Sequence, residues 1–372
     1  MIMANDLNIT VTGSAGFIGQ NLILHLRERG YANIHAISRE SCRAERKAAY
    51  AASSVIFHLA GVNRPQSAEE FMPGNLLPAT ELGDALRDSK LHPLVIVASS
   101  TKAGDETPYG QSKRKAEEAL LAMSDHATVL CYRLSNVFGK WCRPNYNSAV
   151  ATFCYNLARG IEISINEAAP LTLVYIDDII GEWLDLLEPN DAQTGVVSPK
   201  TVYESTVGEV AGLLRNFAAS RLTIELDGVG AGLPRALYST YLSYLPPDAM
   251  SYELKAHTDP RGTFSEMLRT KTTGQFSYFT AHPGITRGGH YHHTKTEKFL
   301  VLNGKARFRF RHMLTDETVE ILTDGNKPIV VETPPGWSHN VTNIGDDTLI
   351  CMLWANEKFN PAKPDTVAAK VF

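Results

Sequence analysis

The chain has 372 residues, of which 44% are hydrophobic and 20% are charged, and its formal net charge at pH 7 is −4. This length suits two domains, and the negative net charge excludes nucleic acid and anionic membrane surfaces as expected partners. No apolar run reaches the roughly 18 residues that a membrane span requires. No signal peptide is recognisable, and the five cysteines form no CxxC pair, so we expect a cytoplasmic protein with reduced thiols.

Short apolar runs alternate with helical patterns in the first part of the chain. A β-rich run at residues 7–12 is followed by a glycine-rich turn and by a helical pattern at residues 21–29. Four further strands are predicted at residues 34–38, 55–60, 94–99 and 129–134, and a helix at residues 112–123. Strands that alternate with helices are typical of a parallel sheet covered on both faces. We therefore expect an α/β domain.

Three glycines, Gly13, Gly16 and Gly19, lie between the first strand and the first helix. Without side chains, the backbone can turn sharply there and approach a pyrophosphate, which the N-terminus of the helix attracts. The pattern predicts a dinucleotide site of Rossmann type.

Tyr109 and Lys113 lie one helical turn apart and share one face of the predicted helix. A nearby cation favours phenolate, so Tyr109 is predicted to exchange a proton near neutral pH. Thr101, or alternatively Ser100, ends the preceding strand and could hydrogen-bond a substrate oxygen. The pair and the upstream glycine turn together predict an oxidoreductase site.

These features resemble the extended short-chain dehydrogenase/reductase family over about residues 7–245. The matching segments are residues 12–19, 58–61, 99–101, Tyr109 with Lys113, Arg133 with residues 136–139, and residues 175–178. The resemblance implies that Tyr109 is the proton donor and acceptor, that Lys113 binds the nicotinamide ribose, and that Thr101 polarises the carbonyl. It implies a nucleotide-sugar substrate and the following cofactor-binding residues: Gly13, Gly16, Phe17, Ile18, Gly19, Ser38, Arg39, Leu59, Ala60, Gly61, Tyr109 and Lys113.

The second predicted strand ends in Ser38 and Arg39 rather than in an acidic residue. A carboxylate at this point would favour the ribose 2′-hydroxyl of NAD, whereas an arginine suits the 2′-phosphate of NADP. We therefore predict NADPH as the cofactor.

The composition changes after residue 235. Residues 235–247 are rich in tyrosine and end in a Pro-Pro pair, and we interpret them as a linker between a reductase domain at residues 1–246 and a second domain at residues 247–372. Short β runs follow at residues 274–280, 298–302, 306–310, 329–332 and 348–354. They predict an all-β barrel or jelly roll. The Arg-Phe alternation at residues 307–312 is interpreted as a strand with Phe inward and Arg outward rather than as a nucleic-acid patch.

A cluster of metal-binding residue types lies in this second domain. His290 and His292 alternate, so on a strand both would point to one face. Glu297 follows after a turn, and His339 comes later. Imidazole nitrogens and a carboxylate suit a divalent transition metal.

The spacing resembles the cupin family. Its first motif is matched by Gly284, His290, His292, Glu297 and Gly304, and its second by Pro334, Gly336, His339 and Asn343. The resemblance implies a jelly-roll fold and a divalent metal, with zinc as our prediction, bound by His290, His292, Glu297 and His339. Residues 287–291 are also similar to the dTDP-sugar 3,5-epimerases, metal-free cupins whose histidine is the general base. His290 is thus a candidate both as metal ligand and as catalytic base.

The whole chain is similar to a family of bifunctional capsular polysaccharide enzymes, in which an extended short-chain dehydrogenase/reductase is fused to a cupin. Residues 58–65, 138–148 and 237–246 carry this similarity together with the cupin motifs. It implies C3 epimerisation of a UDP-4-keto-6-deoxy-N-acetylhexosamine, then NADPH reduction to UDP-2-acetamido-2,6-dideoxy-L-talose, on the way to N-acetyl-L-fucosamine. We expect a homodimer. Two alternatives stay open: a single-activity 4-ketoreductase whose cupin serves dimerisation or sensing, and a non-catalytic NADP sensor.

Overall fold

The computed structural model describes residues 7–188, 191–226, 228–255, 257–259, 262–264, 267–268, 274–357, 360 and 362–372. The chain divides into two compact units. Unit 1 comprises Met1–Phe138, Tyr146–Ser148 and Leu171–Glu204, and unit 2 comprises Gly139–Asn145, Ala149–Pro170 and Ser205–Phe372. Within the part of the chain that the structure describes, no helix is long and apolar enough to cross a membrane.

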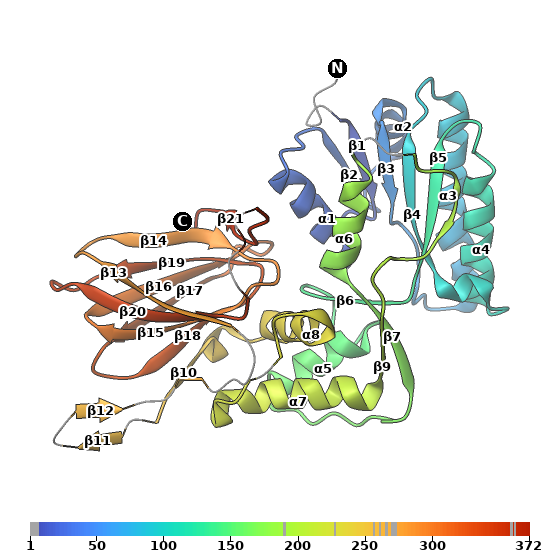
Figure 1. Ribbon diagram of the computed structural model, residues 1–372. Helices are drawn as coiled ribbons and strands as arrows, with labels where there is room; N and C mark the ends of the chain where they lie inside the picture. The colour runs from blue at the N-terminus through green and yellow to red at the C-terminus, as the bar shows by residue number, and fades with distance from the viewer. Residues whose placement is uncertain are drawn as a thin grey trace. The chain divides into compact units, whose positions relative to one another are not determined.

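Unit 1 is built on a six-stranded sheet in the order β2-β1-β3-β4-β5-β8, and all of its strand pairs are parallel (Figure 1). The strands are β1 (Ile9–Thr12), β2 (Ile34–Ile37), β3 (Val55–His58), β4 (Leu94–Ser100), β5 (Thr128–Leu134) and β8 (Gly195–Val197). The helices are α1 (Phe17–Glu28), α2 (Arg43–Ala52), α3 (Phe71–Asp88), α4 (Pro108–Leu121) and α6 (Ile176–Asp185), with the 3-10 helices η2 (Ala68–Glu70) and η3 (Thr101–Gly104). Strands β6 (Asn136–Phe138), β7 (Pro170–Tyr175) and β9 (Tyr203–Thr206) form a small additional sheet.

Alternating side chains of the strands bury both faces of the large sheet. Ile56 of β3 belongs to a core that α2, α3 and α4 complete. Its neighbour Phe57 points the other way, and its ring centroid lies 6.1 Å from that of Trp183 in α6. The prediction of a parallel sheet covered on both faces is confirmed.

Unit 2 contains two five-stranded antiparallel sheets (Figure 1). The first has the order β10-β18-β15-β20-β13 and the second the order β17-β16-β19-β14-β21. The first comprises β10 (Ser251–Glu253), β13 (Gln275–Ala281), β15 (Glu297–Asn303), β18 (Ile329–Thr333) and β20 (Leu349–Ala355). The second comprises β14 (Thr286–Tyr291), β16 (Lys305–His312), β17 (Thr318–Asp324), β19 (Trp337–Asn343) and β21 (Val367–Ala368).

One core joins the two antiparallel sheets. Phe299 and Val331 of the first sheet and Phe308 and Phe310 of the second are buried in the same cluster. Arg309, between the two phenylalanines, points outward and donates to Glu320 at 2.9 Å. The all-β prediction and the Phe-inward interpretation of this strand are therefore confirmed. A separate hairpin pairs β11 (His257–Asp259) with β12 (Gly262–Phe264).

Three helices also belong to unit 2: α5 (Ala149–Leu157), α7 (Val207–Thr223) and α8 (Gly232–Ser243), with the 3-10 helix η4 (Pro247–Ala249). The prediction of a linker at residues 235–247 is wrong, because most of this segment lies in α8. Leu237, Tyr238, Tyr241 and Leu242 are each at most 2% exposed, and these positions recur at helical spacing. The boundary between residues 246 and 247 stays a prediction.

Candidate active sites in the two units

The glycine-rich turn joins the carboxyl ends of β1 and β3. The hydroxyl of Thr12 accepts hydrogen bonds from the backbone N–H groups of Leu59 and Ala60, both at 3.1 Å. Gly13 has φ +66°, and a Cβ at this position would lie 2.9 Å from the nitrogen of Ala60. Only glycine therefore lets the two strand ends approach this closely.

The same turn leads into α1 with equally little space. A Cβ at Gly19 would lie 2.4 Å from the carbonyl oxygen of Gly13. Gly16 is the N-cap of α1 and supplies no side-chain hydrogen bond to the helix. The first N–H groups of α1, at Phe17 and Ile18 among others, thus have no side-chain cap, as an anion-binding helix start requires. The cofactor role of these residues stays a prediction.

Ser38 and Arg39 directly follow β2, at the same edge of the sheet as the glycine turn. The N–H group of Ser14 donates to the carbonyl of Ile37 at 3.1 Å, which ties the turn to the end of β2. Arg39 is exposed. The predicted 2′-phosphate residues therefore stand beside the predicted pyrophosphate turn.

Tyr109 lies in the first turn of α4, and its hydroxyl hydrogen-bonds Ser100, at the end of β4. Burial raises the pKa of Tyr109, while the bond from Ser100 opposes that shift. The expectation that Lys113 would lower this pKa toward neutrality is therefore wrong for this structure. Ser100 is 9% exposed, whereas Thr101 is exposed in η3, so the geometry favours Ser100 as the partner of Tyr109.

Lys113 is a part-buried cation one turn further along α4. Its Nζ donates to the carbonyl of Ala98 at 2.9 Å. Burial lowers the pKa of Lys113 to about 8, although Glu117 on the same helix raises it. A Cβ at Gly61 would lie 2.7 Å from Oδ1 of Asn75 in α3, so the segment after β3 can pack this closely against α3 because residue 61 is glycine.

Two buried polar residues that sequence reasoning missed support Lys113. Asn75 of α3 accepts from the N–H of Val62 at 3.0 Å and donates to Ser112 at 3.0 Å, which fixes the chain after Gly61 against α4. Glu117 forms a 2.7 Å ion pair with Arg133 of β5. Neither stands in a motif; only the helical spacing of Glu117 from Lys113 could have pointed to it.

The histidine cluster of unit 2 arises where β14 pairs with β19, because His290 and His339 are direct partners in that register. A bulge lies between Gly288 and His290. Gly288 has φ +101°, and a Cβ there would lie 2.8 Å from the carbonyl oxygen of His339. His292 directly follows β14, and Glu297 begins β15.

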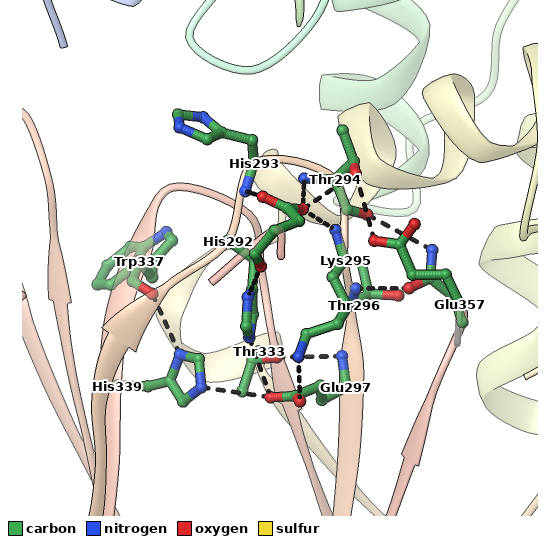
Figure 2. Close-up of polar contacts among 12 residues, drawn as sticks. His292, His293, Thr294, Lys295, Thr296, Glu297, Thr333, Trp337, His339 and Glu357 are labelled. Atoms are coloured by element: carbon green, nitrogen blue, oxygen red, sulfur yellow. Dashed lines mark hydrogen bonds and ion pairs between the residues drawn. The ribbon is translucent and has the colours of Figure 1, made fainter. Parts of the chain in front are cut away.

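The four predicted ligands offer nitrogen and oxygen atoms that all lie within 4.8 Å of one another: His290, His292, Glu297 and His339. Glu297 Oε2 lies 3.2 Å from Nε2 of His292 and 3.4 Å from Nε2 of His339 (Figure 2). The ring centroid of His290 is 4.8 Å from that of His339. The structure therefore brings all four together.

The charge state of the cluster suits a cation. Burial lowers the pKa of His290 to about 3, with further lowering from His339 and His292. Burial would raise the pKa of Glu297, but hydrogen bonds from His292 and His339 hold it well below its ordinary value. Neutral imidazoles beside a carboxylate are the ligand forms that a divalent metal requires, so these residues fit the predicted ion.

Backbone carbonyls orient two of the rings. Nδ1 of His339 donates to the carbonyl of Trp337 at 3.3 Å, and Nδ1 of His292 donates to the carbonyl of Asp365. A carbonyl only accepts, so each ring carries a proton on Nδ1, and Nε2, the nitrogen beside Glu297, is the atom that would bind a cation once it is deprotonated. Lys295, which sequence reasoning missed, places its Nζ 3.1 Å from Glu297 Oε1.

Two family models match the chain. Residues 9–195 match the NAD dependent epimerase/dehydratase family, and residues 257–367 match the polysaccharide biosynthesis C-terminal domain. The UDP-2-acetamido-2,6-beta-L-arabino-hexul-4-ose reductase of Pseudomonas aeruginosa is 49% identical over 368 residues, which are 98% of this chain and 99% of that protein.

Solved structures match as well. The capsular polysaccharide assembling protein CapF from Staphylococcus aureus is 41% identical with a TM-score of 0.67, and the match covers 98% of this chain and 100% of that one. MoeE5 in complex with UDP-glucose and NAD is 20% identical with a TM-score of 0.53, over 63% of this chain and 98% of that one. The second likeness concerns the fold alone.

Proposed function

The chain belongs to the NAD dependent epimerase/dehydratase family and is a close homologue of CapF, and on that premise we propose that it is a bifunctional UDP-sugar enzyme. In general terms it is an NAD(P)-dependent UDP-sugar reductase. In the full proposal the cupin-like unit epimerises C3 of a UDP-4-keto-6-deoxy-N-acetylhexosamine. The parallel-sheet unit then reduces the C4 ketone to UDP-2-acetamido-2,6-dideoxy-L-talose, a precursor of N-acetyl-L-fucosamine for capsule or O-antigen.

The observation that carries the reductase assignment is the bond between Tyr109 and Ser100, one helical turn from the part-buried Lys113. Bound NADPH supplies the hydride for C4. Because burial raises the pKa of Tyr109, its hydroxyl keeps its proton at neutral pH and can deliver it to the carbonyl oxygen as that oxygen gains charge. Ser100 takes the carbonyl-polarising role that the family resemblance gave to Thr101, and Lys113 holds the ribose.

The epimerase assignment rests on the histidine cluster. The 4-keto group acidifies the C3–H bond, so a base can remove this proton and a proton can return to the other face. A divalent metal, zinc in this proposal, supplies Lewis-acid stabilisation of the enolate charge. His290 is more exposed than His292, Glu297 and His339, so in this proposal it acts as the base and leaves the other three residues to hold the metal.

The experiment uses the full-length protein with a UDP-4-keto-6-deoxy-N-acetylhexosamine in D₂O, followed by NMR. Without NADPH, we expect deuterium at C3. With NADPH, we expect a C4 alcohol that carries deuterium at C3. Protium at C3 under both conditions would contradict the epimerase half, and absence of ketone-dependent NADPH oxidation would contradict the reductase half.

A single-activity 4-ketoreductase with a non-catalytic cupin is the second candidate, because the Pseudomonas relative is named only as a reductase. In that case the D₂O experiment gives reduction of UDP-2-acetamido-2,6-β-L-arabino-hexul-4-ose without label at C3. If neither of the two 4-keto sugars gains deuterium at C3 while both are reduced, the single-activity reductase would replace the bifunctional proposal.

Finer assignments belong to the same proposal: NADPH rather than NADH, a homodimer, and a cytoplasmic location. Arg39 supports NADPH because it is exposed beside the glycine turn, where a guanidinium can pair with a 2′-phosphate. Arg39→Ala is expected to reduce the preference for NADPH over NADH about tenfold or more, since hydrogen bonds to charged groups contribute about 1.5–3 kcal/mol. Arg43→Ala, in the first turn of α2, is the control. An unchanged preference in Arg39→Ala would contradict the NADPH assignment.

A further inference from the structure

Residues 365–372, here called the strap, lie along the strand that carries His290. Strand β21 within the strap pairs with β14, with Val367 opposite Tyr291 and Ala368 opposite His290. The N–H group of Ala369 extends this ladder by donating to the carbonyl of Gly289 at 2.9 Å. The strap therefore completes the sheet beside a predicted metal ligand.

The strap also contacts the strand that carries His339. The hydroxyl of Ser338, which precedes His339, donates to the carbonyl of Ala369 at 2.7 Å. Arg311 of β16 donates to the carbonyl of Lys370 at 2.7 Å, and Val371 is 2% exposed. These contacts attach the strap to three strands of one sheet.

Asp365 begins the strap and holds the loop between β14 and β15. Its carboxylate accepts from the successive backbone N–H groups of His293, Thr294 and Lys295 at 2.9, 2.7 and 2.7 Å. The hydroxyl of Thr294 donates to the same carboxylate at 3.0 Å. Three successive N–H groups that converge on one carboxylate fix the backbone of a loop, because each bond to the ionised group is charge-assisted.

This loop spans the interval between two predicted ligands. His292 precedes it and Glu297 follows it in the sequence, and Figure 2 shows the loop residues Thr294 and Lys295 together with both of them. Asp365 also accepts the Nδ1 proton of His292 through its own carbonyl. One residue therefore sets both the course of the loop and the tautomer of a ligand.

The opposite side of the loop is fixed independently. The carbonyl of Thr294 accepts from Ser239 of α8 at 2.7 Å, and Asn356 accepts from the N–H of Thr296 at 2.8 Å. Loss of Asp365 would therefore release one side of an otherwise anchored loop, which argues for a local effect on the ligands rather than for general unfolding.

We propose that Asp365 is a positioning residue for the metal centre, which acts through the 293–295 loop and through His292. The inference rests on the proposed metal site but not on the epimerase activity. Residues that orient metal ligands in this way typically contribute about 10–100-fold to metal affinity.

The test measures zinc affinity of the full-length, metal-stripped protein by competition with a chromophoric chelator. Asp365→Asn keeps the side-chain size but turns an amide NH₂ or a single oxygen toward the N–H donors, so affinity is expected to fall about 10–100-fold. Asp346→Asn is the matched control, because Asp346 lies in the same unit with an exposed side chain, and its zinc affinity should equal that of wild type.

Two readouts separate positioning from a purely structural role. Thermal unfolding of the metal-free Asp365→Asn variant should stay cooperative, with a Tm only a few degrees below that of wild type because the loss is local, and the absorption spectrum of the cobalt-loaded variant should change. If Asp365→Asn is insoluble, Thr294→Val decides instead. It removes one hydrogen bond to the carboxylate, with an expected loss of about fivefold in affinity, the equivalent of about 1 kcal/mol.

Wild-type affinity in the folded Asp365→Asn variant, or in Thr294→Val where that variant decides, would overturn the inference and leave the metal site intact. Failure of the wild-type protein to bind zinc or cobalt at all would overturn the proposed metal site itself, and the positioning role would fall with it.

Discussion

The candidate site of unit 1 is built around a part-buried cation, Lys113, whereas the site of unit 2 is built around a buried carboxylate, Glu297. Burial lowers the pKa of Lys113 to about 8, so this cation lies close to its titration point. Glu297 is 7% exposed yet stays ionised because two histidines hydrogen-bond it. The first arrangement suits proton transfer and the second suits a bound cation.

The two sites also differ in how the chain assembles them. In unit 1, parallel strands end at one edge of the sheet, and glycines allow backbone segments from distant parts of the chain to meet. In unit 2, side chains meet because β14 and β19 pair in a register that places His290 opposite His339. Substitutions in one site should therefore change the reaction of that site and leave the other reaction intact.

Tyr109→Phe should separate the two sites most strongly. Loss of the general acid is expected to lower the rate of NADPH oxidation about 10²–10⁴-fold, while deuterium incorporation at C3 in D₂O without NADPH stays at the wild-type rate. Tyr278→Phe, on β13 with a side chain 72% exposed, is the control. A parallel loss of both activities in Tyr109→Phe would mean that the sites are not independent.

Glu297→Gln should have the converse effect. Removal of the central carboxylate is expected to lower metal content and to slow C3 exchange about 10²-fold, since a Lewis acid contributes several kcal/mol to charge stabilisation. Reduction of an already epimerised ketone should persist. Glu320→Gln, whose exposed carboxylate pairs with Arg309, should retain both the metal and the exchange. Full exchange by a metal-free Glu297→Gln protein would instead favour the metal-free epimerase mechanism.

A pair of glycine substitutions in unit 1 tests the close packing of the turn. Gly19→Ala places a Cβ 2.4 Å from a carbonyl oxygen, and such overpacking costs about 1–3 kcal/mol of unfolding free energy. Gly181→Ala in α6 meets no atom within 4 Å and should be neutral or stabilising by up to about 1 kcal/mol. Urea denaturation and NADPH titration measure both. Equal stability of the two variants would contradict the packing argument.

The pH dependence of the reductase gives the smallest effect. Since Tyr109 has a raised pKa, the first loss of activity with rising pH should come from deprotonation of Lys113. The rate of NADPH oxidation should therefore begin to fall near pH 8. In Lys113→Arg this fall should move to higher pH.

Deprotonation of Lys113 affects stability in the opposite direction from activity. Between about pH 8 and its ordinary pKa of 10.5, Lys113 binds its proton only in the unfolded chain, so its contribution to the free energy of unfolding increases as pH rises. Below about pH 8 the penalty of burying the cation is fully present. If the rate of NADPH oxidation falls at the same pH in Lys113→Arg as in wild type, another group is responsible for the loss of activity.

Most strands and both clusters could be predicted from local patterns. The apolar run at residues 94–99 and the Arg-Phe alternation at 307–312 contain their own periodicity, so β4 and β16 were found. Helix α8 was missed because tyrosines and a following Pro-Pro pair were interpreted as a linker. Its buried positions, at Leu237, Tyr238 and Tyr241, do recur at helical spacing.

The residues that support the two sites could not be predicted from local sequence patterns. Asn75 and Asp365 are single polar residues without a repeated spacing, and their roles depend on partners 13 to 73 positions away in sequence. The choice of Ser100 over Thr101 likewise depends on how β4 passes into η3. Only three-dimensional packing determines which neighbouring hydroxyl turns toward Tyr109.

The register that joins His290 to His339 and to Ala368 has a consequence for how the protein matures. Each of these contacts closes a long loop, and non-local pairings of this kind form late because chain entropy must be overcome first. The proposed metal site should therefore be among the last features to form during refolding. In any preparation, the metal bound per chain would then serve as a measure of the fraction of molecules that have completed folding.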